Sequence, residues 1–194
     1  MIEALVGLLE AKDTSTAAHT WRVVLYTRAL AEKAGVSADD LERLTAAAAL
    51  HDIGKIEIPS AILQKPGKLT DDEFEVMKSH AALGHERLIR MGEDDRVILD
   101  LVRHHHERFD GMGYPDGLAG DEIPVAARYF AVIDSFDAMT SIRPYRRETG
   151  VHAAEKAIAE LESGIRTRYC PGTVEMFVSM YRTGELGWIL EYFN

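Results

Sequence analysis

The chain has 194 residues, of which 46% are hydrophobic, and a formal net charge of −10. A chain of this length can bury one substantial core, and no linker-like stretch divides it, so we expect a single domain over residues 1–194. The acidic balance disfavours nucleic acid polymers and anionic lipid as partners, no stretch is long and uncharged enough to span a membrane, and Cys170, the only cysteine, excludes an intrachain disulfide. We therefore expect a cytoplasmic protein, in which metal ions and a few local cations would be needed to hold an anionic substrate.

The first part of the chain predicts two helices. Apolar residues recur at helical spacing over residues 16–34. Ser37 followed by Asp40 is typical of a helix N-cap, and the apolar spacing that comes after it predicts a second helix. The pair His51-Asp52 closes that helix.

A proline- and glycine-containing stretch, residues 54–69, then predicts a connecting loop without regular structure. Thr70 and Glu73 form a capping box, which indicates the start of a helix. The apolar spacing carries this helix past His80 to about Ile89, so we expect one continuous element there.

The second half of the chain also reads as helical. A helix is predicted over 95–105, followed by a glycine-rich irregular stretch over 107–123, whose length and position favour a functional role. Pro124 is placed at a helix start, and further helices are predicted over 151–163 and after Pro171. No segment alternates with a period of two, so we expect an all-α fold with essentially no sheet.

Histidine and aspartate side chains stand beside several of these helix ends. They are His19, His51 with Asp52, His80, His105, His106 and Asp134. Imidazole and carboxylate groups suit iron, manganese or zinc, and seven ligands exceed what one site normally takes, so the set favours two metals that share a bridging carboxylate. Such a pair suits phosphodiester hydrolysis.

The alternative is that these histidines are unrelated core or surface residues, as lone histidines usually are. His85 and His152 are interpreted in that way. Consecutive helical residues point about 100° apart, so His104, His105 and His106 cannot all face one site, and one of them should be a bystander.

The local sequence around these residues resembles a known family. His51-Asp52-Ile53-Gly54-Lys55 is similar to the HD signature of metal-dependent phosphohydrolases, and the stretch from His105 to Pro115 resembles the long motif that names the HD-GYP family. Segments 65–70 and 123–146 look like the family's intervening segments. The resemblance covers about residues 5–178, which leaves 179–194 as a C-terminal extension.

The resemblance implies an all-helical fold with a five-helix HD core and additional C-terminal helices. It also implies two divalent metal ions per chain, iron or manganese, with Asp52 bridging them and His104 as the bystander. The ligands carried over are His19, His51, Asp52, His80, His105, His106 and Asp134. Some family members hold a third metal through a glutamate, but Ser15 occupies that position here, and a hydroxyl is a poor ligand compared with a carboxylate.

The implied activity is hydrolysis of cyclic di-GMP to linear pGpG or onward to GMP, by attack of a hydroxide held between the two metals. Asp52 and Lys55 are the expected catalytic residues, and Lys55 would stabilise charge on the scissile phosphate. Contacts with the substrate are expected from Lys55, Asp110, Gly113, Tyr114, Asp137, Arg143 and Arg146.

Two other functions remain open from the sequence. The same motifs would suit another cyclic dinucleotide, such as cyclic GMP-AMP, and a non-catalytic module could bind the nucleotide without cleaving it. The apolar final segment, which includes Trp188 and Phe193, would suit a cover for the core or a homodimer contact. A regulatory domain or partner protein outside this chain is also expected from the resemblance.

Overall fold

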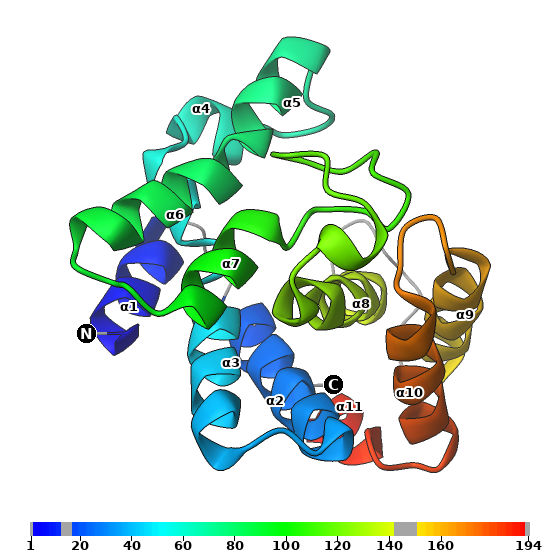
Figure 1. The fold of residues 1–194 in the computed structure, drawn as a ribbon. Helices are drawn as coiled ribbons and strands as arrows, with labels where there is room; N and C mark the ends of the chain where they lie inside the picture. The colour runs from blue at the N-terminus through cyan, green and yellow to red at the C-terminus, as the bar shows by residue number, and fades with distance from the viewer. Residues whose placement is uncertain (1, 13–16, 142–150, 193–194) are drawn as a thin grey trace.

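Helices make up the regular structure of the computed structural model, which describes residues 2–12, 17–141 and 151–192 (Figure 1). These residues form no strand, only two isolated bridges, Asp110 with Ala119 and Ile165 with Tyr169. The all-α expectation is therefore confirmed. The α-helices are α1 (Ile2–Lys12), α2 (Ala17–Ala34), α3 (Ala38–Leu50), α4 (Ser60–Leu63), α5 (Asp71–Lys78), α6 (His80–Arg90), α7 (Arg96–His104), α8 (Val125–Thr140), α9 (Val151–Ser163), α10 (Pro171–Arg182) and α11 (Gly187–Tyr192), and the 3-10 helices are η1 (Ile53–Glu57) and η2 (Gly120–Glu122).

Five helices form the centre of the fold. Helices α2 and α7 each pack on both α3 and α8 (Figure 1). Helix α6 lies against α7. Their inner faces share a buried apolar cluster in which Tyr26 meets Phe136 edge to face, with ring centroids 5.6 Å apart. Burial of side chains of this size contributes about 2 kcal/mol each, so this cluster fixes how the five helices sit against one another.

The C-terminal helices cover one side of this centre. Helices α9 and α10 pack on α8, and α11 packs on α2 (Figure 1). Leu186 and Ile189 are fully buried, whereas Trp188 between them is half exposed. Part of the apolar C-terminal segment therefore covers the core, which was one of the two roles expected for it. Phe193 lies outside the described residues.

Residues 54–69 contain more regular structure than the sequence predicted. The loop prediction is wrong for η1 and α4, which occupy most of the stretch before Pro66. Pro59 does not prevent a helical turn: it stands at the N-cap of α4, where no backbone donor is needed. The side chain of Lys12 also donates hydrogen bonds to the carbonyls of Ile56 and Ile58 and so holds the end of η1 against α1.

The helix predicted from Thr70 to Ile89 is two helices, α5 and α6, with a break at Ser79. The capping box of Thr70 and Glu73 at its start is confirmed. At the break, Ser79 Oγ donates to the carbonyl of Val76 at 2.6 Å and His80 Nδ1 donates to that of Met77 at 2.7 Å. Side chains thus occupy carbonyls that a continuous helix would use for its main chain. The break makes His80 the first residue of α6.

Glycine allows η1 to approach α6 closely. A Cβ built on Gly54 would lie 1.9 Å from the carbonyl oxygen of His80 and 2.5 Å from the amide nitrogen of Gly84. Only a residue without a side chain fits at this contact. The approach brings the end of α3 next to the start of α6, which places two of the predicted metal-binding positions side by side.

The remaining helix predictions agree with the structure to within a few residues. Ser37 caps α3 by accepting a hydrogen bond from the amide of Asp40, and Pro171 is the first residue of α10. Helix α8 follows Pro124. No helix in the described ranges has both the length and the hydrophobicity needed to cross a membrane.

Candidate metal centre

Each of the five central helices supplies at least one side chain to a single cluster. Most of these side chains lie at helix ends, where the chain leaves one element and enters the next. The cluster contains His19 near the start of α2, His51 and Asp52 after α3, His80 at the start of α6, His105 and His106 after α7, and Asp134 within α8. The structure therefore brings all seven expected ligands together.

The first group consists of His19, His51 and Asp52, whose candidate ligand atoms all lie within 4.8 Å of one another. The Nε2 atoms of His19 and His51 are 3.3 Å apart, and His51 Nε2 is 3.1 Å from Asp52 Oδ2. Asp134 joins this group through its Oδ1, which lies 3.5 Å from His19 Nε2. The Nε2 atoms of His19 and His51, together with carboxylate oxygens of Asp52 and Asp134, could hold one ion.

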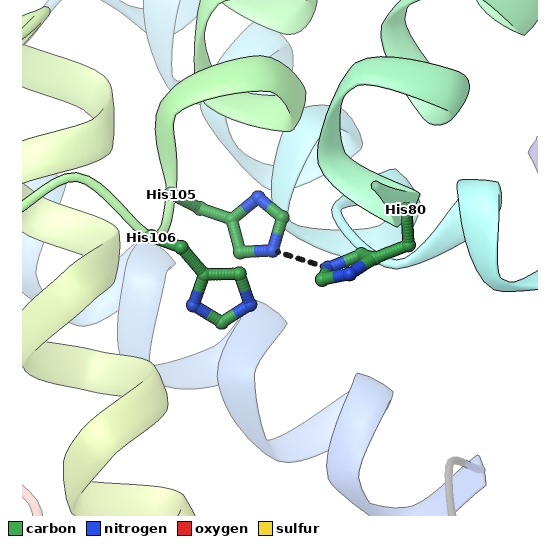
Figure 2. A group of neighbouring side chains, drawn as sticks. All are labelled: His80, His105 and His106. Atoms are coloured by element: carbon green, nitrogen blue, oxygen red, sulfur yellow. Dashed lines mark hydrogen bonds between the residues drawn. The ribbon is translucent and has the colours of Figure 1, made fainter. Parts of the chain in front are cut away.

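The second group consists of His80, His105 and His106. Figure 2 shows their rings turned toward one another, from the start of α6 and from the turn after α7. His80 Nε2 lies 3.2 Å from His105 Nε2, the dashed contact in Figure 2. The ring centroids of His105 and His106 are 4.1 Å apart, and those of His80 and His106 are 5.1 Å apart. Three imidazoles in this arrangement could hold a second ion.

Asp52 lies between the two groups and directs one carboxylate oxygen to each. Its Oδ2 faces His51 of the first group, and its Oδ1 lies 3.4 Å from His80 Nε2 of the second group. A carboxylate that bridges two ions must present its oxygens in this way. The geometry therefore suits Asp52 as a ligand shared by two ions.

Main-chain carbonyls orient three of these histidines. The Nδ1 atoms of His51, His80 and His105 donate to the carbonyls of residues three positions earlier, at 2.8, 2.7 and 2.9 Å. A neutral imidazole that donates from Nδ1 keeps its lone pair on Nε2. Lone pairs of Nε2 atoms that face each other at 3.2–3.3 Å repel unless a proton or a cation lies between them, so this donor set fits divalent metal ions.

The electrostatics of the cluster keep Asp52 and the histidines of the second group in their metal-binding forms, whereas for His51 burial lowers the pKa but the neighbouring Asp52 outweighs it and raises the pKa. Burial lowers the pKa of His106 to about 4 and lowers the pKa of His105 well below its usual range. Burial also lowers the pKa of His80. For Asp52, burial raises the pKa, but the neighbouring His51 and Lys55 outweigh it and hold the pKa well below the ordinary value. The histidines of the second group are therefore neutral and Asp52 is ionised at neutral pH.

Asp137 contacts the ring nitrogen of His19 that does not face the cluster. Its Oδ2 accepts a hydrogen bond from His19 Nδ1 at 2.7 Å, and its Oδ1 accepts one from Arg22 Nε at 2.5 Å. Ser141 Oγ also donates to Asp137, whose exposed fraction is 0%. Asp137 was expected to contact the substrate, but the structure buries its carboxylate instead. The carboxylate orients the candidate ligand His19 by accepting a hydrogen bond from its Nδ1, while Nε2 of His19 faces the centre.

Glu107 holds the irregular stretch 107–123 in place. Its carboxylate accepts hydrogen bonds from the backbone amides of Asp116, Gly117 and Leu118, at 2.8, 3.0 and 3.1 Å. Glu107 thereby satisfies three successive backbone amides of this loop.

The loop places its other expected site residues at different distances from the centre. The ring of Tyr114 packs on that of His106, with centroids 4.8 Å apart. Gly113 lies against the backbone, because a Cβ there would be 2.3 Å from the amide nitrogen of Arg108. Asp110 is exposed and paired with Arg108, Nη2 to Oδ2 at 2.6 Å. Of the three, only Tyr114 touches a candidate ligand.

Lys55 is the expected catalytic lysine, and its Nζ lies 2.6 Å from Asp52 Oδ2. His104 faces away from the cluster and contacts Asp116 at 3.0 Å, which is where a bystander would lie. Ser15, Arg143 and Arg146 are outside the described residues, so the structure does not place the expected third-metal position or the two arginines.

The sequence contained a signal for the Arg22–Asp137 pair that motif matching missed. Arg22 follows His19 by three residues, and Asp137 follows Asp134 by three, so each stands on the same helix face as a candidate ligand. The contacts His19–Asp134 and Arg22–Asp137 thus connect α2 and α8 at two positions, one helical turn apart.

Comparisons with known proteins agree with this geometry. A family model described as HD domain matches residues 3–172. A "Cyclic di-GMP phosphodiesterase" of Thermotoga maritima is 42% identical over 93% of this chain, and a "Cyclic di-GMP phosphodiesterase response regulator RpfG" of Xanthomonas campestris is 44% identical over 79% of it. The chain spans 48% and 41% of these two proteins, or about half their length.

A solved structure is also similar to the chain. It is a crystal structure of a cyclic GMP-AMP-specific phosphodiesterase from Vibrio cholerae, 31% identical, with a TM-score of 0.58. The match covers 93% of this chain and 40% of that one. The HD domain match over residues 3–172 includes the five helices that carry the cluster.

Proposed function

Because the chain belongs to the HD domain family, with the HD-GYP motifs intact, we propose that it is a metal-dependent phosphodiesterase that hydrolyses cyclic di-GMP to linear pGpG, GMP or both. One observation carries this proposal: His19, His51, His80 and His105 direct Nε2 atoms at one buried cluster in which Asp52 faces two groups of ligands. The relatives named above support the choice of substrate.

We assign the seven ligands to two ions, with Asp52 shared between them. A pair of divalent ions bound there supplies Lewis acidity and lowers the pKa of a water molecule, which is the chemistry that phosphodiester hydrolysis requires. The mixed imidazole and carboxylate set suits iron and manganese. Ser15 in place of a carboxylate argues against a third ion.

Lys55 and Tyr114 both lie beside the cluster, Lys55 next to Asp52 and Tyr114 next to His106, and both would act on the substrate. The Lys55 ammonium lies beside Asp52, where it can neutralise charge on a non-bridging phosphate oxygen. Burial raises the pKa of Tyr114, with Asp52 and Asp134 adding to the rise, so its phenol stays protonated and can donate a hydrogen bond. We keep Arg143 and Arg146 as proposed phosphate or guanine contacts. Asp110 and Gly113 were expected to contact the substrate, and we now propose that they shape the loop instead.

The test is anaerobic purification with metal quantitation, followed by chromatography of reaction products from cyclic di-GMP. We expect about two ions per chain and formation of pGpG or GMP that stops when a chelator removes the metal. Three ions per chain in fully loaded protein would contradict the two-ion assignment. A fully loaded protein that cleaves no cyclic dinucleotide would refute the activity, and binding without cleavage would identify a sensing module instead.

A second substrate has specific support. The solved structure of 31% identity is described as specific for cyclic GMP-AMP, and a Vibrio cholerae relative that is 37% identical is named a 3'3'-cGAMP-specific phosphodiesterase. A side-by-side assay with cyclic di-GMP, cyclic GMP-AMP and cyclic di-AMP separates the two. Faster turnover of the mixed ring, at matched metal content, would favour the second substrate.

A further inference from the structure

Two aromatic rings and one ammonium group lie just outside the metal centre, on the side of α5. Lys78 Nζ lies over the ring of Phe74, 5.6 Å from its centroid, and over the ring of Tyr114, 5.8 Å from its centroid. The Tyr114 ring packs in turn on His106, one of the candidate ligands. A continuous series of contacts therefore leads from the metal centre to the surface of α5.

The fold does not need the Phe74 ring at this position. The side chain is 49% exposed, and α5 contains no buried residue. An exposed ring gains little stability from its surroundings, yet this one stands beside a cation at the edge of a charged site. Aromatic faces of this kind stack on nucleobases, because every base presents a π face.

Lys78 can change its partner at little cost. Its Nζ pairs with Glu75 Oε1 at 2.6 Å, one helical turn earlier, and Glu75 is 69% exposed. Surface pairs of this kind contribute little to stability, since water screens both charges. In a chain with a net charge of −10, an ammonium beside the centre is therefore available to an acceptor on an incoming ligand.

We propose that Phe74 and Lys78 form a guanine-binding subsite at the edge of the metal centre, in which the Phe74 ring stacks on the base and the Lys78 ammonium donates to O6 and N7. This inference rests on the proposed function, since it takes a cyclic dinucleotide as the ligand of the centre. Guanine presents two acceptors on this edge, whereas adenine presents one acceptor and an amino donor. The subsite therefore favours guanine over adenine.

Four variants test the subsite with cyclic di-GMP and cyclic di-AMP as substrates. Phe74→Leu keeps an apolar side chain but removes the aromatic face, and Phe74→Tyr keeps that face. Lys78→Met removes the ammonium and keeps the length of the side chain. Val76→Ala is the matched control, because Val76 is an exposed apolar residue of the same helix without a contact to Lys78 or Tyr114 among those described.

We expect Phe74→Leu to raise KM for cyclic di-GMP about tenfold at unchanged metal content, with the effect on KM and not on kcat. Phe74→Tyr and Val76→Ala keep KM close to that of the wild type. Lys78→Met raises KM for cyclic di-GMP about tenfold and KM for cyclic di-AMP much less, so the preference for the guanine ring falls. Equal effects of Lys78→Met on the two substrates would overturn the guanine assignment.

A binding measurement separates this inference from the proposed function. Isothermal titration with a slowly hydrolysed phosphorothioate analogue of cyclic di-GMP reports affinity whether or not the protein turns over its substrate. Absence of hydrolysis in the metal-loaded wild type refutes the activity alone. The subsite is overturned if the wild type, Phe74→Leu and Lys78→Met bind the analogue equally, or if the wild type does not bind it.

Discussion

Replacement of Asp137 with asparagine removes a buried charge while it keeps the shape of the side chain. In the wild type the carboxylate accepts hydrogen bonds from Arg22 and His19 and is fully buried. Loss of one partner from a buried ion pair costs about 3–5 kcal/mol, because the other charge stays in a poorly hydrated place. The Arg22 side chain is 14% exposed and also donates to Ser141, so we expect the lower end of that range, about 3 kcal/mol.

The same replacement should weaken metal binding. Asp137 accepts a hydrogen bond from His19 Nδ1, which leaves the Nε2 lone pair directed at the centre. Loss of such a carboxylate partner typically reduces metal affinity about 10- to 100-fold. Urea unfolding in the presence of a chelator measures the first effect, and titration of the metal against a competing chelator measures the second.

Asp121→Asn provides the matched control. Asp121 also pairs with an arginine, Arg128, but it is 91% exposed. Water screens that pair, so we expect almost no change in the urea midpoint and none in metal affinity. If Asp137→Asn behaved like Asp121→Asn in both assays, the orienting role of Asp137 would be refuted.

Three further predictions follow from the cluster and its surroundings. Asp52→Ala removes the carboxylate shared by both ligand groups, so metal content measured by mass spectrometry should fall below one ion per chain and hydrolysis should be lost; retained hydrolysis would exclude Asp52 as the bridge. In metal-free protein, the pKa of His106 is about 4 in the folded state and about 6.5 in the unfolded state, so the unfolded chain binds a proton first as the pH falls. The free energy of unfolding should therefore fall by about 2 kcal/mol between pH 7.5 and pH 5. Urea midpoints of His106→Asn should not show this part of the pH dependence. Gly54→Ala puts a Cβ 1.9 Å from a backbone oxygen and should destabilise the fold by about 3 kcal/mol, a fall of roughly 6–12 °C in Tm, whereas Gly7→Ala, with nothing within 4 Å of the added Cβ, should not lower Tm.

Local signals in the sequence were enough to predict most helices. The caps at Ser37 and at Thr70 with Glu73 were confirmed, because a cap is a contact between residues three positions apart. Breaks were harder: the helix predicted through Ser79 is interrupted there, where side-chain hydrogen bonds compete with the main-chain ladder. Apolar periodicity does not report that competition.

The sequence also predicted a candidate ligand set, in part because the HD and HD-GYP motifs place His51, Asp52, His105 and His106 at fixed spacing. It did not determine how those residues face one another. The role of Asp137 illustrates the difference: it looked like a substrate contact, yet its partner His19 lies 118 positions away on another helix. The proposed subsite of Phe74 and Lys78 on α5 likewise lies beside Tyr114 of the loop after α7, which is far away in the sequence.

Helix type and position depend on interactions within a few residues, so the sequence by itself fixed the all-α class, the caps and the candidate ligands. The orientation of Asp52 between two groups of histidines depends on how α3, α6 and α7 pack, and that packing includes the contact of Gly54 with the backbone of α6. Such contacts join residues far apart in the chain, and only the tertiary structure decides them.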